Sequence, residues 1–129
     1  MFKNLLRAFL GLEKKVERWD HVMWENRMID QATFERLVRI GEVGLSDQML
    51  FANHRNLMVR AALSTTASDH GVLAKLSCDP EWTVRSNVIF NPYVTRDIIQ
   101  KMFTDSEPEI SHDSLAVFQR RFATARETF

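Results

Sequence analysis

The stretch DPEWTVRSNVIFNPYVTRDIIQKMFTD, residues 79–105, sets the pattern from which the fold can be predicted. Its first residues favour the start of a helix, because the Asp79 carboxylate can accept from free backbone amides and Pro80 supplies the fixed φ of a first turn. Asn91-Pro92 should end that helix, since the residue before a proline is pushed out of the helical region. The first half of the stretch therefore predicts one short helix.

The second half of the stretch predicts another helix, which packs against the first. Thr95 and Asp97 suit its N-terminus, where side-chain oxygens cap free amides. Apolar residues then follow at the spacing of one buried stripe: Ile98, Ile99, Met102 and Phe103. Residues 79–105 as a whole are thus expected to form an antiparallel helix pair.

The preceding stretch, NHRNLMVRAALSTTASDHGVLAKLSC at residues 53–78, has the same order of features. Val59-Arg60 and Val84-Arg85 stand 25 residues apart, and Ser68 is expected to cap the second helix of the earlier unit. The later apolar positions match with one inserted residue: Leu73 and Leu76 before Asp79, then Ile99 and Met102 before Asp105. Such a period is typical of stacked repeats, because one unit cannot bury its apolar face alone.

The flanking segments predict further helices. Residues 30–40 and 45–52 suggest a helix pair broken by Gly41 and Gly44, with two apolar sets, Phe34, Leu37, Val38 and Leu45, Met49, Leu50. N-terminal helices are expected within residues 1–30, over about Phe2–Leu10 and Leu12–Arg27. Residues 106–129 are expected to form an atypical capping helix, since a terminal unit must face water.

We therefore predict one all-α domain over residues 1–129, with repeat-like helix pairs over residues 31–105. The expected architecture is a small α-solenoid of stacked antiparallel helix pairs, without a sheet and with atypical terminal helices. The residues predicted to form its core are Val59, Leu63, Leu73, Leu76, Val84, Val88, Ile99, Met102 and Phe103.

The order Asp-Pro, Val-Arg, Asn-Pro at residues 79–92 resembles the unit of the leucine-rich repeat variant family, which is similar to HEAT repeats. The preceding unit keeps Val59-Arg60 but has Thr66-Ala67 where Asn-Pro belongs, so the resemblance covers about two-fifths of the chain. It implies a helical repeat fold. The iron–sulfur function of some members is not implied, because this chain lacks their added cysteine cluster.

The competing interpretation is the true leucine-rich repeat, whose unit requires the strand pattern Leu-x-x-Leu-x-Leu closed by Asn or Cys. The segment from Leu73 to Cys78 matches that pattern once, whereas the segment from Ile99 to Thr104 loses the third apolar position. The helical unit is therefore the preferred prediction.

The charge balance and the cysteine count restrict the function classes. Lys and Arg together number 17, equal to Asp and Glu, so the chain has no overall field to attract nucleic acid or an anionic membrane. Its one cysteine, Cys78, suits a reducing compartment, and we expect a cytoplasmic protein. No stretch approaches the roughly 18 uninterrupted apolar residues that a membrane span needs.

The motifs of enzymes and metal sites are absent from the sequence. It has neither a glycine-rich phosphate loop nor a nucleophile elbow, and its histidines, His21, His54, His70 and His112, share no ligand spacing. We therefore expect no catalytic residue, no metal site and no cofactor, and do not expect an enzyme.

Arg60 and Arg85 recur at the same place in successive units, and two hypotheses follow. As a basic stripe they would bind the phosphates of a nucleic acid. As structural groups each would bind the Asp at a unit boundary, Asp79 or Asp105, or open helix-end carbonyls, for which a guanidinium fork is well suited. The structural hypothesis is preferred.

Trp82 and Tyr93 flank the first helix of the best-formed unit, near opposite rims of the expected stack, and Arg96 follows Tyr93 closely. Aromatic residues and arginine are enriched at binding hot spots, so these three are the candidate protein-binding residues. The predicted function is a non-catalytic protein-binding module, an adaptor or a stoichiometric inhibitor of another protein. The alternative is a nucleic-acid-binding helical repeat. The apolar stripe of residues 2–10 is expected to close the end of its own domain or to meet a second subunit in a homo-oligomer, rather than to contact a membrane.

Overall fold

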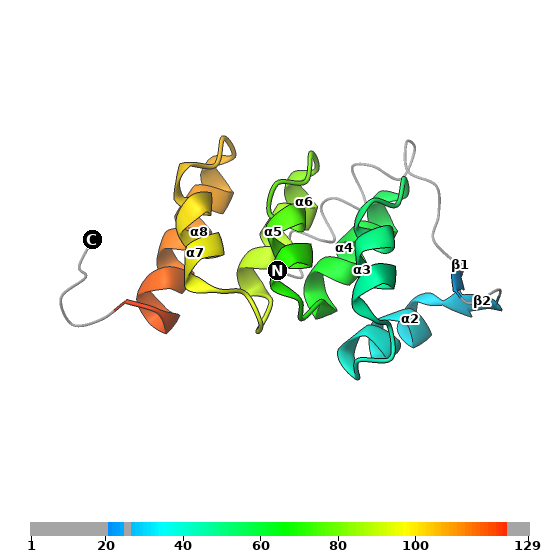
Figure 1. Ribbon diagram of the computed structural model, residues 1–129. Coiled ribbons are helices and arrows are strands. Elements are labelled where there is room, and N and C mark those ends of the chain that lie inside the picture. The colour runs from blue at the N-terminus through cyan, green and yellow to red at the C-terminus, as the bar shows by residue number, and fades with distance from the viewer. Residues whose placement is uncertain (1–20, 25–26, 124–129) are drawn as a thin grey trace.

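The computed structural model of this 129-residue chain describes residues 21–24 and 27–123, which are mostly helical (Figure 1). This part contains a two-stranded hairpin, seven α-helices and one short 3-10 helix. In chain order the elements are β1 (His21–Trp24), β2 (Arg27–Asp30), α2 (Gln31–Arg39), α3 (Leu45–Ala52), α4 (Leu57–Thr66), α5 (His70–Leu76), α6 (Trp82–Phe90), α7 (Arg96–Lys101), η1 (Met102–Thr104) and α8 (Pro108–Arg121).

The hairpin corrects two predictions, a helix reaching Arg27 and a fold without a sheet. β1 and β2 pair antiparallel in a register that runs from His21 opposite Asp30 to Trp24 opposite Arg27. Val22, Trp24 and Ile29 carry β-branched or aromatic side chains, which favour strands, and a short apolar run does not by itself distinguish a strand from a helix. The helix predicted over residues 2–10, with its oligomer contact, lies outside the described residues.

The helices follow one another in pairs along the molecule. In Figure 1 the pairs α3–α4, α5–α6 and α7–α8 lie side by side. Helix α4 contacts α2 on one side and α6 on the other, and α6 in turn contacts α8, whereas α3 contacts α5. Over residues 21–24 and 27–123, no helix is both long and apolar enough to cross a membrane.

The predicted core is confirmed almost entirely. Eight of the nine residues are buried, namely Val59, Leu63, Leu73, Leu76, Val84, Val88, Ile99 and Met102. The ninth, Phe103, is partly buried and packs against this core, with its ring edge-to-face on Phe118 at 5.2 Å between centroids. The apolar stripes of α4 to α7 therefore point where the periodicity placed them.

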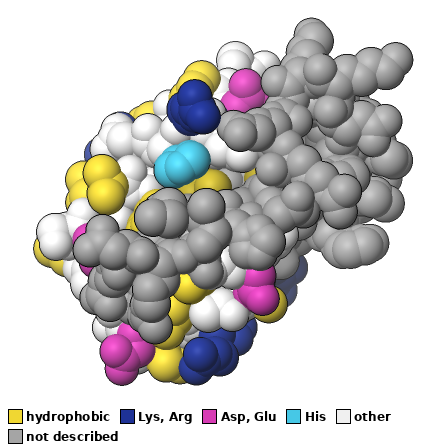
Figure 2. Space-filling model, turned by 90° about the vertical axis from the view of Figure 1, so that its right-hand side faces the viewer, with side chains coloured by type: hydrophobic (Ala, Val, Ile, Leu, Met, Phe, Trp, Pro, Cys, Tyr) yellow, Lys and Arg dark blue, Asp and Glu magenta, His cyan; other side chains and the backbone are white. Residues whose placement is uncertain are grey.

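Helix α3 is rotated from its predicted orientation. Leu45 and Leu50 are 56% and 66% exposed, and the buried residues of this helix are Gln48, Phe51 and Ala52. Phe51 decides the orientation, because its ring packs edge-to-face on Phe34 of α2 at 4.7 Å between centroids. Figure 2 shows hydrophobic side chains at the surface on one end of the molecule.

The helix termini agree with the prediction in position and differ in two caps. Helix α2 ends before Gly41, whose φ of 81° is easily adopted only by glycine. The carboxylate of Asp69, rather than the predicted Ser68, caps α5 by accepting from Val72 N at 3.1 Å. Thr95 precedes α7 as predicted, but its hydroxyl donates to the Asp97 carboxylate and makes no cap bond.

The predicted C-terminal capping helix corresponds to α8, which begins with Pro108 in its first turn. Phe118 is buried on its inner face, whereas Leu115 and Phe122 are only partly buried. Residues 124–129, the end of the predicted segment, lie outside the described residues.

Candidate functional site

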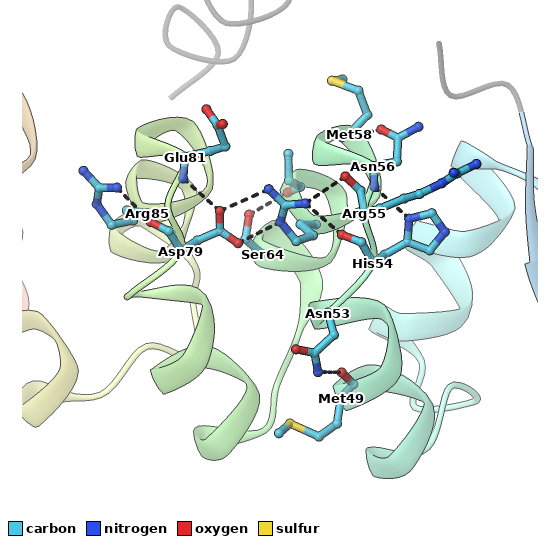
Figure 3. Close-up of polar contacts among 12 residues, drawn as sticks. Met49, Asn53, His54, Arg55, Asn56, Met58, Ser64, Asp79, Glu81 and Arg85 are labelled. Carbon is cyan, nitrogen blue, oxygen red and sulfur yellow. Dashed lines mark hydrogen bonds and ion pairs between the residues drawn. The ribbon is translucent and has the colours of Figure 1, made fainter. Parts of the chain in front are cut away.

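Arg60 of α4 pairs with Asp79 in the loop between α5 and α6. Its Nε donates to Asp79 Oδ2 at 2.8 Å, and its Nη2 donates to Oδ1 at 3.3 Å. Its Nη1 donates to two backbone oxygens just before α4, those of His54 at 2.7 Å and Arg55 at 3.2 Å. Figure 3 shows these contacts converging between the labelled Asp79 and His54. One guanidinium thus joins the α5–α6 loop to the α3–α4 loop.

Arg85 of α6 repeats this geometry one unit later. Its Nε donates to Asp105 Oδ2 at 2.9 Å, and its Nη2 donates to Oδ1 at 3.1 Å. Its Nη1 donates to the backbone oxygen of Asp79 at 2.8 Å. That acceptor stands six residues before Arg85, as His54 stands six residues before Arg60. The two units therefore share the same donors and the same kinds of acceptor.

Both pairs are largely removed from water. The side chains of Arg60 and Asp79 are 12% and 5% exposed, and those of Arg85 and Asp105 are 14% and 9% exposed. The structural hypothesis for the two arginines is confirmed in its contacts, since each binds a boundary Asp and a backbone carbonyl. A phosphate at either position would compete with a bidentate, charge-assisted pair that is already formed.

The turn that precedes each of α4, α6 and α8 is closed by one side-chain acceptor. Asp79 Oδ1 accepts from Glu81 N at 2.9 Å, and Asp105 Oδ1 accepts from Glu107 N at 2.8 Å. In the first turn the acceptor is the Nδ1 atom of His54, which accepts from Asn56 N at 3.0 Å. His54 therefore occupies the place that an aspartate holds in the next two units.

A cavity of about 410 Å³ lies beside the Arg60–Asp79 pair. Its lining comes from the end of α3, from α4 and α5, and from the loops before α4 and α6: Ala52, Asn53, His54, Arg55, Arg60, Lys75, Cys78, Asp79 and Pro80. The volume falls within the range of small-molecule sites, about 300–1,000 Å³, but such sites are mostly apolar, whereas most of the residues around this cavity are polar or charged. Among residues 21–24 and 27–123, no cluster of three or more His, Cys, Asp or Glu could hold a metal ion.

Tyr93, in the α6–α7 loop, is 50% exposed. The buried side chain of Asn91 fixes the backbone beneath it. Asn91 Nδ2 donates to the backbone oxygens of Ser64 at 2.9 Å and Ala67 at 3.0 Å, while its Oδ1 accepts from Tyr93 N at 2.7 Å. The loop that displays Tyr93 is thereby attached to the end of α4.

Arg121, near the end of α8, holds the same loop from the other side. Its Nη1 donates to the backbone oxygen of Asn91 at 3.2 Å, and its Nη2 donates to that of Pro92 at 2.9 Å. Its guanidinium carbon lies 5.0 Å from the centre of the Phe122 ring. Tyr93 therefore projects from a loop that is fixed by both neighbouring units.

The other two candidate residues have structural contacts of their own. Arg96 donates from Nη1 to the backbone oxygen of Phe122 at 2.9 Å, and its guanidinium carbon lies 4.9 Å from the centre of the Phe118 ring. Trp82 is partly buried and packs against the core at the first residue of α6. Tyr93 and Arg96 thus follow one end of α6, and Trp82 lies at the other.

His70 and Asp97 form an exposed pair between α5 and α7. His70 Nε2 lies 2.9 Å from Asp97 Oδ2, and both side chains are about half exposed. The hydrogen bond from the Thr95 hydroxyl, followed by that from His70, lowers the pKa of Asp97 from 3.8 to about 2. The carboxylate is therefore charged at any physiological pH.

Sequence reasoning missed Asn91 and Arg121 as the residues that fix the Tyr93 loop, and it missed His54 as the first turn acceptor. Asn91-Pro92 signalled only the end of a helix, and the carbonyl partners of a side-chain amide in another unit leave no mark in the sequence. An imidazole in place of a carboxylate also hides the repeat at residue 54. In comparisons with family models, curated proteins and solved structures, nothing matches this chain.

Proposed function

We propose that this chain is a non-catalytic protein-binding module, acting as an adaptor or a stoichiometric inhibitor on a small α-solenoid of the HEAT-like or leucine-rich repeat variant kind. The repeated geometry of the Arg60–Asp79 and Arg85–Asp105 pairs supports the repeat assignment. So does the packing of α4 between α2 and α6, because each unit of a solenoid contacts mainly its neighbours.

The display of Tyr93 carries the binding proposal. A half-exposed aromatic side chain on a fixed loop loses little conformational freedom when a partner covers it, which favours affinity. Aromatic and arginine side chains supply many of the strongest contacts in protein interfaces. Arg121, held by two loop carbonyls, places a cation beside this loop. We assign the centre of the contact to Tyr93, with Arg96 beside it and with Trp82, at the opposite end of α6, reached by a partner that spans this helix.

Photo-crosslinking from position 93 tests this proposal. A photoreactive phenylalanine replaces Tyr93 in one variant and the exposed Gln119 of α8 in a matched control, and each full-length protein is irradiated in a nuclease-treated native lysate. We expect one discrete protein adduct from position 93 and none from position 119. Adducts that are absent, or equal from both positions, would contradict the proposal.

A second measurement separates contact from stability. Tyr93→Ala should weaken binding to the captured protein roughly 30-fold, which corresponds to the loss of a typical hot-spot residue, while the melting temperature stays unchanged. If Tyr93→Ala also lowered the melting temperature, the weaker binding would reflect a role of Tyr93 in folding instead. Tight binding to random duplex that collapses with added salt would favour the nucleic-acid alternative.

A further inference from the structure

We infer that the protein bound at Tyr93 presents an acidic segment, an inference that rests on the proposed binding function and adds the chemistry of the partner to it. The carboxylates of this segment pair with Arg120 and Arg121 at the end of α8, while an apolar side chain covers the Tyr93 ring. Tyr93, Arg120 and Arg121 together are called the Tyr93 surface below.

The Arg121 guanidinium is held next to Tyr93. It donates to the backbone oxygens of the two preceding residues, Asn91 at 3.2 Å and Pro92 at 2.9 Å, and its carbon lies 5.0 Å from the centre of the Phe122 ring. A guanidinium has five N–H donors, so these two bonds leave three for a partner. A side chain that is already ordered also loses little conformational freedom when it binds. Arg121 is therefore prepared to bind an acceptor at the edge of the Tyr93 ring.

The charges of Arg120 and Arg121 are not neutralised by any carboxylate of residues 21–24 and 27–123. The hydrogen bonds of Arg121 go to uncharged backbone oxygens. Arg120 stands beside it in the last turn of α8, is exposed, and forms no ion pair with this part of the chain. This contrasts with Arg60 and Arg85, each of which is paired with an aspartate. The end of α8 thus carries two positive charges that an external acid can meet.

Acidic side chains are scarce in the segments that surround the Tyr93 surface. Residues 88–104 contain one, Asp97, and residues 114–123 contain none. The Asp97 carboxylate accepts from the Thr95 hydroxyl and lies 2.9 Å from His70 of α5. Within α8, Asp113 precedes Arg120 by about two helical turns, or about 10 Å along the axis. The described part of this surface is therefore positive, although the whole chain has 17 basic and 17 acidic residues.

An acidic protein segment complements this surface in both charge and shape of contact. Carboxylates form short, charge-assisted and often bidentate hydrogen bonds with guanidinium groups. The Tyr93 ring, which is 50% exposed, offers an apolar face for a neighbouring side chain. A nucleic acid fits less well, because duplex binding gains its affinity by neutralising many phosphates and Arg120 and Arg121 offer two cations. Opposite charge on the partner would also speed encounter and fix the orientation of the complex.

Titration of the full-length protein with two synthetic peptides tests the preferred chemistry. One peptide alternates glutamate and leucine over about eight residues, and the other has glutamine in place of glutamate. At about 50 mM salt we expect the glutamate peptide to bind about tenfold more tightly, and at about 500 mM salt less than about threefold. In ¹⁵N NMR spectra the glutamate peptide should shift the Tyr93 amide and the Arg121 Nε resonance. Equal binding of the two peptides, or shifts confined to other residues, would overturn the inference.

Arg120→Glu is the decisive variant, because Arg120 makes no contact that holds the Tyr93 loop. Its matched control is Arg39→Glu, since Arg39 is likewise an exposed arginine in the last turn of a helix, α2. We expect Arg120→Glu to weaken binding of the glutamate peptide about five- to tenfold and Arg39→Glu to weaken it less than about twofold, with melting temperatures that agree between the two variants. Equal losses of binding would reveal attraction to charge in general and would overturn the inference.

The adduct formed from position 93 distinguishes this inference from the proposed binding function. Mass spectrometry of the adduct locates the crosslinked segment of the partner, in which we expect an aspartate or glutamate within about four residues of the crosslink. An adduct on a segment without carboxylates would overturn the inference and leave the binding function intact. A missing adduct would count against the binding function, whereas the peptide titration would still support or overturn the preference for carboxylates. Displacement of the glutamate peptide by random duplex at equal anion concentration would assign the surface to nucleic acid instead.

Discussion

The helix pairs α4–α5 and α6–α7 have the same sequence period, and each contains an arginine that pairs with the aspartate that follows the pair. The polar contacts that join each pair to its neighbour are different. Two side-chain amides, one within α6 and one at the residue after it, reach the carbonyls of α4 and of Ala67: Asn87 donates to Ala61 O at 3.1 Å, and Asn91 donates to Ser64 O and Ala67 O. The residues 25 positions earlier in α4 are Ala62 and Thr66.

Ala62 has no side-chain donor, and the Thr66 hydroxyl donates to the backbone of its own helix, to Ala62 O at 3.4 Å. The repeated spacing thus determines the apolar packing and the arginine contacts, whereas the amide links to a neighbouring unit depend on residues that are not repeated. We therefore expect the two helix pairs to contribute unequally to stability.

Apolar truncations should give the largest contrast along the chain. Ile99 is fully buried in α7. Leu50, which the sequence places in the apolar set of α3, is 66% exposed. We expect Ile99→Ala to lower the free energy of unfolding by about 3 kcal/mol through lost burial and a cavity, and Leu50→Ala to lower it by less than about 0.5 kcal/mol. Urea unfolding measures both free energies. Equal losses would mean that Leu50 is buried, as the sequence predicted for α3.

The turn acceptors should give the next largest contrast. Asp79→Ala removes the partner of a mostly buried guanidinium together with the Glu81 amide contact, so we expect it to cost about 3 kcal/mol. His54→Ala at pH 7.5 removes one amide contact and should cost about 1 kcal/mol. If Asp79→Ala and His54→Ala had the same free energy of unfolding, the Arg60–Asp79 ion pair would add no stability beyond that of the turn contact.

The polar links between the two helix pairs should give a smaller difference, which Asn91, at the end of α6, can test. Asn91→Ala leaves the carbonyls of Ser64 and Ala67 without this donor and frees the Tyr93 amide, for an expected loss of about 2 kcal/mol. Thr66→Ala, at the equivalent position of α4, should cost less than about 0.5 kcal/mol. Comparable losses in urea unfolding would mean that the two units are linked alike.

The smallest expected effect concerns the exposed link between α5 and α7. The pKa of Asp97 is lowered from 3.8 to about 2, so its contribution is complete above pH 3.8 and is lost as the pH falls through about 2. NMR titration of the carboxyl carbon should show this low pKa, and Thr95→Ala should raise it toward 3.8 more than His70→Ala does. Identical pKa values in all three proteins would contradict the contacts assigned to Asp97.

The sequence predicts what depends on periodicity and misses what depends on contacts between units. The spacing of Val-Arg and Asp leads to the buried stripes and to the Arg85–Asp105 pair, because both recur at a fixed distance. It does not reveal the orientation of α3, which depends on how Phe51 meets Phe34, nor the hairpin, whose apolar residues fit either a strand or a helix. Tyr93 is exposed just past α6, but the groups that fix its loop come from residues 64, 67 and 121, which the sequence pattern does not link to it.

The repeated arginine contacts also allow further units to be inserted into the chain. Arg60 pairs with Asp79 across 19 residues, and Arg85 pairs with Asp105 across 20. The distances from Nε to Oδ2 are nevertheless 2.8 and 2.9 Å. The segment between the arginine and its aspartate can therefore differ in length by one residue while the ion pair is kept. A duplicate of residues 79–104 placed after residue 104 would give the existing Arg85 a new aspartate and give Asp105 a new arginine. The junction between residues 104 and 105 is therefore a position at which longer arrays can be built from copies of residues 79–104.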